Sequence, residues 1–337
     1  MEETLLYHCI ALTLENDYRR IAAVKIGRTW KEAWEAIAPA AKARPDDEWE
    51  KFKKHGVRLI LREDPDFPEL LKEIPFSPFG IYVRGKIPAA PCSVAIVGTR
   101  KATEGGKTTA KKIAGELARA GCLIVSGLAL GIDAAAHRGA LEAGGKTIAV
   151  LANGVDAPYP RMNADLAKKI LECGGGLISE YPPGAPSLPY RFLERNRIIS
   201  GLSRGVAVIE APRQSGSLAT ARFATEQNRE VFVIPGPATH PNFAGSHALI
   251  RQGAELVTEA GHILEALGIT PTPNSLTADA ETPEEALVIR ALKESQTPLS
   301  IDKIIELTNL KTNVASRTVS FLTIKNIIRE SGTGYTI

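Results

Sequence analysis

The stretch SVAIVGTRKATEGGKTTAKKIAGELARAGCLIVSGLALGIDAAAH, Ser93–His137, decides the fold class. It opens with the apolar run Val94–Val97, continues through an amphipathic segment at Lys107–Ala120, and reaches a second apolar run at Leu123–Val125. Short runs that are apolar throughout are typical of strands buried on both faces of a sheet. A strand, a helix and a second strand of this kind predict a parallel β-α-β unit.

The same alternation continues toward the C-terminus. Asp133–Ala143 has the spacing of another amphipathic helix. Further apolar runs of strand length lie at Thr147–Leu151, Leu177–Ile178, Val206–Ile209 and Val231–Ile234. Repeated strand–helix alternation with buried strands predicts an α/β fold built on a Rossmann-like, doubly wound parallel sheet.

Two smaller units are expected to flank this sheet. Residues 1–62 predict a helical domain. Its amphipathic stretches are Leu5–Leu14, Arg19–Ile26, Trp30–Ile37 and Asp46–His55. Residues 63–268 hold the Rossmann-like domain with its proline-rich lead-in, and residues 269–283 are polar and proline-rich, which predicts a linker. Residues 284–337 predict three helices and a small hairpin, the winged-helix pattern.

Composition excludes several classes of protein. The 337 residues are 44% hydrophobic, an ordinary share for a globular chain. No apolar run approaches the ~20 residues that span a bilayer. Because no charged-then-apolar leader opens the chain, we expect neither a signal peptide nor a membrane anchor, and a cytoplasmic location. The four cysteines show no CxxC pair and the histidines no metal-binding spacing, which predicts reduced thiols and no metal site.

Charge is unevenly distributed along the chain. The net charge of +3 resolves into zero for residues 1–90 (15 basic, 15 acidic), +7 for residues 91–222 (17 and 10) and −4 for residues 223–337 (9 and 13). A local positive excess can hold a polyanion even when the whole chain is nearly neutral. The same lysines and arginines would also serve as solvated helix faces, and both interpretations stay open.

The loop after the first strand of the sheet has the chemistry of an anion site. Ligands of doubly wound sheets bind at the carboxyl ends of the strands. Gly98, Thr99, Arg100 and Lys101 stand there, followed by GGKTT at the start of a helix. The loop is not a P-loop, because Lys101 occupies the place of the first glycine of GxxxxGK[ST]. It is not GxGxxG either, because Arg100 replaces the second glycine, so a nucleoside-triphosphatase or dinucleotide site is disfavoured.

The loop after the second strand carries Ser126, Gly127, Gly131 and Asp133. The two glycines would allow a phosphate or sugar to approach the backbone closely. Asp133 could face such a ligand, or it could be a carboxylate favoured by the positive end of the helix dipole. The residues leave both interpretations open.

Later loops add cations and hydrogen-bond donors. Tyr159 and Arg161 follow the third strand. Residues 191–204 contain a dense group of arginines, the side chain best suited to bidentate phosphate contact: Arg191, Arg195, Arg197 and Arg204. Ser215, Gly216 and Ser217 open a further helix. Several such loops on one sheet edge suit a ligand with several phosphates, and a strand of nucleic acid fits better than one mononucleotide. No nucleophile–base–orienter set stands out, so no catalytic residue is assigned.

Seven motifs carry a resemblance to a known family. They are, in order, VAIVGTR, SGLALGIDAAAH, GGKTIAVLANGVDAPYP, GGGLISEYPPG, RNRIISGLSRGVAVIEA, SGSLATARFA and VFVIPGP. In this order and spacing they resemble the bacterial DNA processing protein A (DprA/Smf) family. The three-part layout also resembles that family, with a sterile-alpha-motif-like helical front, a Rossmann-like centre and a winged-helix end.

The resemblance implies a function without catalysis and without a cofactor. A member of that family binds single-stranded DNA through the Rossmann-like domain and forms a homodimer through the same domain. It also interacts with a RecA-type recombinase. It is expected to load that recombinase on incoming DNA during natural transformation, as a recombination mediator in the cytoplasm.

The resemblance also implies roles for individual residues. Arg100 would be a main phosphate contact and Arg161 a second, with the remaining loop residues lining the same pocket. The full DNA-binding set expected from the loops and the resemblance together is Gly98, Thr99, Arg100, Lys101, Ser126, Gly127, Gly131, Asp133, Arg161, Arg195, Asn196, Arg197, Ser215, Gly216 and Ser217.

Three positions depart from the family pattern. Leu130 stands where a basic residue is usual, so one cationic contact is missing or supplied elsewhere. Asn228 replaces a commoner glycine in a turn, which asparagine tolerates because it adopts the left-handed conformation. His247 replaces a frequent asparagine, which leaves any ligand role of that position open.

Two further hypotheses remain open. The enzyme alternative is a nucleotide phosphoribohydrolase of the lysine-decarboxylase-like group, whose PGGxGTxxE signature supplies a glutamate. Here the matching loop has Ala219, Thr220 and Ala221 where an acid is expected, and Glu226 lies further along the helix. Residues 281–337 hold 7 basic and 7 acidic side chains, so we expect the winged helix to contact protein or to bind DNA only weakly.

Overall fold

The computed structural model describes residues 2–40, 52, 56–269, 282–295, 297–325, 327–331 and 334–336. The chain divides into two compact units. One comprises Met1–Ala118 and Cys122–Ile269, and the other Arg119–Gly121 and Thr270–Ile337. The predicted helix at Asp46–His55, apart from Phe52, and the predicted linker, apart from its ends, lie outside the described residues.

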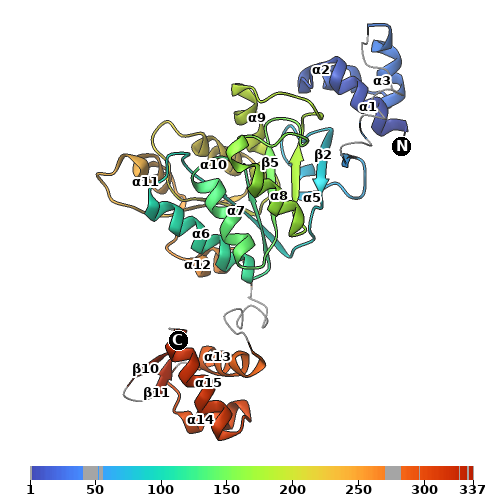
Figure 1. Cartoon of the computed structure of the whole chain (residues 1–337). Coiled ribbons are helices and arrows are strands. Elements are labelled where there is room, and N and C mark those ends of the chain that lie inside the picture. Colours follow the sequence, from blue (N-terminus) through green and yellow to red (C-terminus); the bar gives the residue numbers. More distant parts are fainter. Residues whose placement is uncertain are drawn as a thin grey trace. The chain divides into compact units, whose positions relative to one another are not determined.

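The larger unit is built on one sheet with the strand order β1-β2-β6-β5-β4-β3-β7-β8-β9 (Figure 1). The strands are β1 (Val57–Leu61), β2 (Gly80–Gly85), β3 (Cys92–Val97), β4 (Cys122–Ser126), β5 (Thr147–Leu151), β6 (Gly176–Ser179), β7 (Gly205–Val208), β8 (Glu230–Val233) and β9 (Glu255–Leu256). Strands β3 to β9 are parallel, whereas β2 runs antiparallel to β6 and β1 antiparallel to β2. The predicted parallel sheet and its six predicted strands are confirmed.

Helices cover both faces of the sheet. They are α5 (Glu69–Lys72), α6 (Glu104–Arg119), α7 (Ile132–Glu142), α8 (Ala164–Glu172), α9 (Pro189–Gly201), α10 (Gly216–Glu226), α11 (Ala244–Arg251) and α12 (Ala260–Ala266), with short 3-10 turns at η2 (Arg161–Asn163) and η3 (Pro241–Phe243). Side chains of α7 and α8 share one apolar core with Leu151 and Leu177, while α5, α9 and α10 share the other with Val150 and Ile178. Neighbouring residues of one strand therefore enter opposite cores, as a doubly wound sheet requires.

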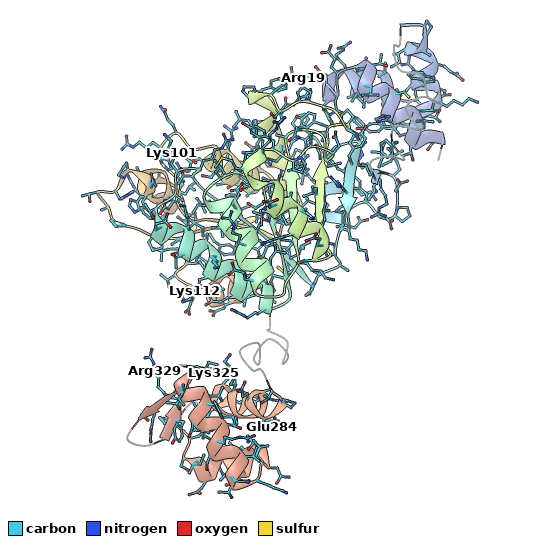
Figure 2. The ribbon with its side chains drawn as sticks, viewed as in Figure 1. Arg19, Lys101, Lys112, Glu284, Lys325 and Arg329 are labelled. Atoms are coloured by element: carbon cyan, nitrogen blue, oxygen red, sulfur yellow. The ribbon has the colours of Figure 1, made fainter. Side chains whose placement is uncertain are left out.

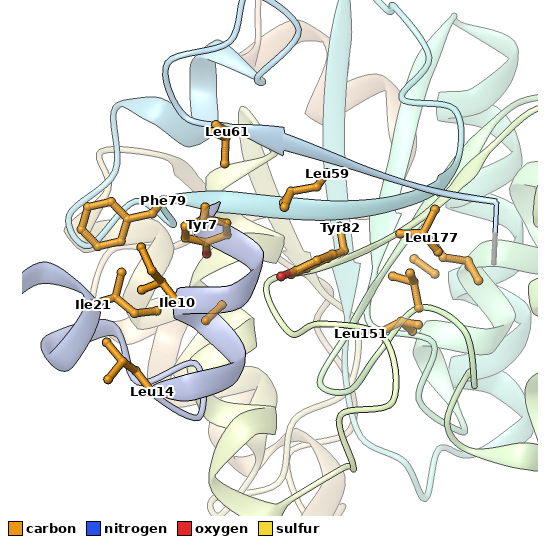
Figure 3. Packing of buried hydrophobic residues seen from close by; sticks show 14 of the residues in the cluster. Tyr7, Ile10, Leu14, Ile21, Leu59, Leu61, Phe79, Tyr82, Leu151 and Leu177 are labelled. Atoms are coloured by element: carbon orange, nitrogen blue, oxygen red, sulfur yellow. The ribbon is translucent and has the colours of Figure 1, made fainter. Parts of the chain in front are cut away.

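The N-terminal helices pack on the antiparallel edge of the sheet. They are α1 (Glu2–Thr13), α2 (Tyr18–Lys25) and α3 (Trp30–Ile37), followed by the 3-10 turn η1 (Ala38–Ala40). The Tyr7 ring lies edge-on to Trp30 at 4.9 Å between centroids, and Trp30 likewise meets Phe79 at 5.7 Å. Figure 3 shows Tyr7 and Ile10 directed toward Phe79 and Leu59. The predicted N-terminal helices are confirmed, and their likeness to a sterile alpha motif stays a prediction.

The structure corrects the expectation that residues 1–62 are helical. Val57–Leu61 form the edge strand β1, which pairs with β2 in the register Leu59↔Tyr82. The segment VRLIL buries every residue but one and lacks the polar spacing of a surface helix, so it extends the sheet instead. The proline-rich lead-in likewise contains α5 and β2, which the sequence did not predict.

The smaller unit has the predicted order of three helices and a hairpin. Its elements are α13 (Pro283–Glu294), α14 (Ile301–Thr308), α15 (Thr312–Ile324), β10 (Arg329–Ser331) and β11 (Gly334–Thr336). The Ser300 hydroxyl caps α14, and Leu299 adds a bridge to Tyr335 of the hairpin. Its hydrophobic core includes Val288, Leu292, Val319 and Leu322. This order of elements is that of a winged helix. Among the described residues, no helix combines the length and apolar character needed to cross a membrane.

Candidate nucleic-acid interface

A cavity of about 560 Å³ opens at the carboxyl ends of β3, β4 and β7. From β3, the strands β4 to β6 extend the sheet on one side and the strands β7 to β9 extend it on the other. The cavity therefore lies where the strand order reverses, at the topological switch point. Nine of the predicted site residues line it: Gly98, Thr99, Arg100, Asp133, Arg195, Asn196, Ser215, Gly216 and Ser217. Strand ends that are distant in the sequence therefore meet where the sequence predicted.

The loop after β3 presents Arg100 at the mouth of the cavity. The Arg100 guanidinium carbon lies 5.0 Å from the centroid of the Phe192 ring, and the residue is exposed. Two backbone hydrogen bonds hold this loop. The Thr99 amide donates to the Glu210 carbonyl at 2.8 Å, and the Ile132 amide donates to the Thr99 carbonyl at 3.3 Å. The backbone of this loop is therefore held in place, and it carries Arg100, whose guanidinium group is exposed to solvent.

Gly131 is required by the packing of the two loops against each other. Its φ is +80°, and a Cβ at this position would lie 2.4 Å from the Thr99 carbonyl oxygen. At Gly127, a Cβ would lie 2.7 Å from Nη2 of Arg195. Gly131 therefore lets its loop pack closely against Thr99, and Gly127 lets the Arg195 side chain pack closely against the backbone. Neither lines the cavity, although the sequence suggested that they admit a ligand.

Two buried side chains of opposite charge, Arg195 and Asp133, line the cavity. The Arg195 Nη1 donates to the Gly127 carbonyl at 2.9 Å and to the Val150 carbonyl. The Asp133 carboxylate accepts from the amides of Gly127 at 3.1 Å and Ala129 at 3.3 Å. Burial lowers the pKa of Arg195 to about 10, against the opposing effect of Asp133. Burial raises the pKa of Asp133, against the lowering effect of Arg195 and of these amides. Asp133 therefore acts both as a lining residue and as a structural acceptor.

The start of α10 forms the opposite wall. The Ser215 side chain accepts from the Ser217 amide at 3.3 Å, and the two hydroxyls lie 2.7 Å apart. Asn196 of α9 donates to the Gly216 carbonyl at 3.1 Å, which ties α9 to this helix start. The Leu218 amide donates to the Ser215 carbonyl at 3.1 Å, and Ser215, Gly216 and Ser217 all line the cavity, so the hydroxyls at this helix start suit an oxyanion.

Aromatic and apolar side chains complete the rim. Tyr159 and Phe192 face each other at 5.8 Å between ring centroids, and both line the cavity with Leu193 and Pro189. The sequence placed Tyr159 after the third strand, but it did not place Phe192 in the site. The signal that would have found it is helical spacing, because Phe192 lies three residues before Arg195 on α9.

Six predicted site residues do not line the cavity: Lys101, Ser126, Gly127, Gly131, Arg161 and Arg197. Arg161 follows the rim residue Tyr159 by two positions and is exposed, as is Lys101, which Figure 2 shows at the surface. Ser126 is fully buried and donates to the Ile96 carbonyl at 2.6 Å, which ties β4 to β3. Its role is structural.

The arginine group at residues 191–204 does not form one surface. Arg197 Nη2 donates to both carboxylate oxygens of Glu180 at 2.6 and 2.7 Å, and this pair is buried. Arg191 donates to the Pro186 carbonyl and lies 4.4 Å from the Tyr181 ring centroid. Arg204 directly precedes β7, so it lies at the amino ends of the strands, whereas the cavity lies at their carboxyl ends. The structure thus corrects the expectation that Arg197 faces the pocket, because residues 195 and 197 lie about 200° apart around a helix.

The exposed cations near the cavity have no acidic partner within ion-pair distance among the described residues. They are Arg100, Lys101, Arg161 and Arg213. Lysines on the helices behave differently, because Lys107, Lys111 and Lys112 pair with Glu104, Glu142 and Glu116. Other exposed cations of residues 91–222, such as Arg119, Lys146 and Arg204, are also without an ion pair among the described residues. The four near the cavity are the part of this positive charge that a polyanion entering the cavity would meet.

The described residues offer little to an enzyme mechanism. Asp133 is the only acidic residue that lines the cavity in the described part of the chain. Glu226 lies at the far end of α10, about 15 Å from its start, with Oε1 at 3.6 Å from Arg222 Nε. The described residues contain no group of three His, Cys, Asp or Glu that could hold a metal ion. At the start of α10, the described residues thus carry no carboxylate at the place of the phosphoribohydrolase signature glutamate.

Fold and site together define a Rossmann-like protein with an anion-binding cavity at the switch point of its sheet. The family model for DNA recombination-mediator protein A matches residues 58–268. The chain therefore belongs to this family, and the resemblance inferred from its motifs is confirmed.

Asn228, at φ +57°, adopts the left-handed conformation predicted from the family pattern, and His247 Nε2 lies 3.1 Å from the Gly236 carbonyl.

Named relatives and solved structures agree with this assignment. The chain is 47% identical over 211 residues to Protein Smf of Escherichia coli, which covers 62% of this chain and 56% of that protein. It is 39% identical over 267 residues to the putative DNA processing protein DprA of Mycobacterium tuberculosis, which covers 75% and 68%. The Escherichia coli match thus spans little more than half of that relative.

Two structures of the family superpose on the chain. The DprA structure from Streptococcus pneumoniae has a TM-score of 0.63 at 33% identity and covers 78% of this chain and 92% of that one. DNA processing protein A from Helicobacter pylori, described as having a unique single-stranded DNA binding mode, has a TM-score of 0.57 at 30% identity and covers 63% and 95%.

Proposed function

We propose that this protein binds single-stranded DNA in the switch-point cavity and acts as a recombination mediator. The carrying observation is the combination of a buried cation, Arg195, beneath an exposed one, Arg100, with the Phe192 ring against both. Arg100 suits a phosphate, Arg195 adds positive charge to the site while its donors hold the backbone, and the Phe192 ring offers a base a stacking surface. The Helicobacter pylori structure supports the same ligand class.

The shape of the site favours a single strand over a duplex. A cavity of about 560 Å³ has room for an unstacked nucleotide, whereas bases in a duplex are stacked and paired and do not enter pockets. Loop contacts to phosphate read no sequence, and a few aromatic rings tolerate any base. We therefore propose strand-specific binding with little base preference.

The proposal extends to partners. The protein would form a homodimer through the Rossmann-like domain and load a RecA-type recombinase on single strands during natural transformation, without catalysis and in the cytoplasm. Family membership supports these steps. The smaller unit would contribute protein contact or weak auxiliary DNA binding, since the exposed positions of α15 carry one cation, Arg317.

The central test is fluorescence anisotropy with labelled oligo(dT) and a matched duplex at two salt concentrations. We expect tighter binding of the single strand, weakening as salt rises. Equal affinity for the duplex at both salt concentrations would contradict the proposed use of the cavity. Deleting residues 270–337 should leave most of the single-strand affinity, and loss of most of it would assign the binding to the smaller unit instead.

A second measurement tests the mediator step. A RecA-type recombinase is added to oligo(dT) that is coated with single-strand binding protein, and its DNA-dependent ATPase is followed with and without this protein. Faster onset supports loading, and an unchanged lag at concentrations that saturate the DNA would contradict it. Incubation with nucleoside monophosphates separates the enzyme alternative, which predicts released base.

A further inference from the structure

Two cysteines lie side by side at the amino ends of neighbouring strands. Cys92 opens β3 and Cys122 opens β4, and the two residues are direct partners in the parallel register. Partner Cα atoms of adjacent strands lie about 4.8 Å apart, and their side chains share one face of the sheet. Disulfides span Cα separations of about 4.4–6.8 Å, so no strand needs to move for these two sulfurs to join.

The two thiols are neighbours across the strand pair and differ in acidity. Both side chains are free thiols, and the interaction of each thiol with the other is the largest influence on its pKa. This interaction lowers the pKa of Cys92 and raises that of Cys122, and the nearby Arg204 guanidinium favours the thiolate of Cys92 as well. The pair therefore has one sulfur biased toward the reactive form and a second in reach of it.

The pair lies at the rim of the sheet. Cys92 is 2% and Cys122 3% exposed, whereas Val94 and Ile124, two residues further along each strand, are completely buried. Pro91, which precedes the pair, and Arg204, which precedes β7, are both exposed. The two sulfurs therefore lie next to exposed residues at the amino ends of the strands, and the site needs a small oxidant to enter there.

We propose that Cys92 and Cys122 form an oxidisable dithiol site whose co-substrate is a peroxide. The Cys92 thiolate attacks one peroxide oxygen, the O–O bond breaks, and hydrogen peroxide leaves one water after a proton is taken up. The Cys92 sulfenic acid is then attacked by the Cys122 sulfur, which forms the S–S bond and releases a second water. Two thiols and one hydrogen peroxide thus give one disulfide and two waters.

The site is separate from the DNA-binding proposal. Cys92 stands seven residues before Thr99 along one strand and its loop, about 23 Å at the rise of an extended chain, and at the opposite edge of the sheet from the cavity. Its oxidation adds a covalent tie between the two strands that carry the Arg100 and Asp133 loops. The site can therefore be tested with no DNA present.

The test treats the reduced full-length protein with hydrogen peroxide, then alkylates the remaining thiols in denaturant and maps the peptides. We expect loss of two alkylatable thiols, a mass lower by two hydrogen atoms, and a peptide pair joined through Cys92 and Cys122 that dithiothreitol separates. Cys173→Ala, which removes the exposed cysteine, should leave this product unchanged. Cys122→Ala should abolish it and leave Cys92 as the oxidised residue.

Two results would overturn the proposal. If peroxide oxidises Cys173 while Cys92 and Cys122 both remain alkylatable, the buried pair is inert. A disulfide that appears only when peroxide is added in denaturant overturns it too, because the native pairing would then contribute nothing. The peptide map of the unmodified chain decides the matter even if the alanine variants fail to fold.

Discussion

Arg100→Ala offers the sharpest test of the cavity as the place where DNA phosphates bind. The side chain is exposed, forms no ion pair among the described residues, and touches the protein mainly through the face of the Phe192 ring at 5.0 Å. Its removal should therefore change the free energy of unfolding by no more than about 0.5 kcal/mol. Loss of binding in this variant would then report a lost contact with the ligand and not a damaged fold.

The expected loss of affinity follows from one charge-assisted contact. Removing such a hydrogen bond at a partly exposed site costs about 1–2 kcal/mol, or about 5- to 30-fold in affinity for oligo(dT). Each phosphate contact to a single strand contributes about 0.7 to the slope of log affinity against log salt. The slope of the variant should be shallower by about that amount, so its affinity falls about 2.6-fold less over a fourfold rise in salt.

Fluorescence anisotropy titrations over a salt series give both quantities. Arg100→Lys is the informative companion, because it keeps the charge and should keep most of the slope while it loses the planar, bidentate geometry. Lys112→Ala on α6, whose charge is paired with Glu116, is the matched control and should bind as the unmodified protein does. If Arg100→Ala and Arg161→Ala both keep the original slope, neither loop follows the DNA backbone and the reasoning fails.

Three further outcomes follow from the same structure. Phe192→Ala should weaken oligo(dT) binding by about 1–3 kcal/mol without changing the salt slope, because a stacking surface is lost and no charge is; a changed slope in titrations would argue against stacking. Arg197→Ala should lower the free energy of unfolding by about 3–5 kcal/mol in urea titrations, because the buried Glu180 carboxylate is left without its partner, and a neutral effect would contradict the structural role. Burial lowers the pKa of His137 to about 3, so the histidine stays neutral in the folded protein while the unfolded chain takes up a proton below its ordinary value of about 6.5. Stability is thus complete above that value and falls as pH drops, by about 2 kcal/mol from His137 between pH 7 and pH 5, and urea titrations should show that His137→Leu removes this share of the pH dependence.

The strands of the sheet were predictable because burial on both faces leaves a simple mark in the sequence. Val94–Val97 and Thr147–Leu151 are apolar throughout, and they form β3 and β5. The edge strands were missed for the opposite reason. Strand β1 reads VRLIL and is followed by a proline-rich segment, and β9 has only the two residues Glu255 and Leu256, both exposed. Edge strands have one paired side and no uniform burial, so their pattern is weak.

The position of the site was predictable and the direction of its side chains was not. Parallel strands bring their carboxyl ends to one edge, and this alone placed Arg100, Asp133 and Ser215 together. Whether an arginine on α9 faces the cavity depends on the rotation of that helix about its axis. Arg195 and Arg197 are two residues apart, and only Arg195 lines the cavity. A count of charges along the sequence treats the two arginines alike, because it does not say which side of α9 faces the cavity.

The charged residues of the family motifs divide into two groups with different physical duties. Arg195 and Asp133 are buried, bonded to the backbone of the loop after β4 and, through Arg195, to β5, and shifted in pKa by the loss of solvent, so they set where that loop lies. Arg100 and Arg161 are exposed and have no partner among the described residues, so their donors are available to a phosphate. A contact residue that is lost should weaken binding alone, whereas a buried one that is lost should disturb folding first and binding through it. Measuring unfolding and DNA affinity on the same variants separates the groups, and only variants that keep the fold locate the path of the strand.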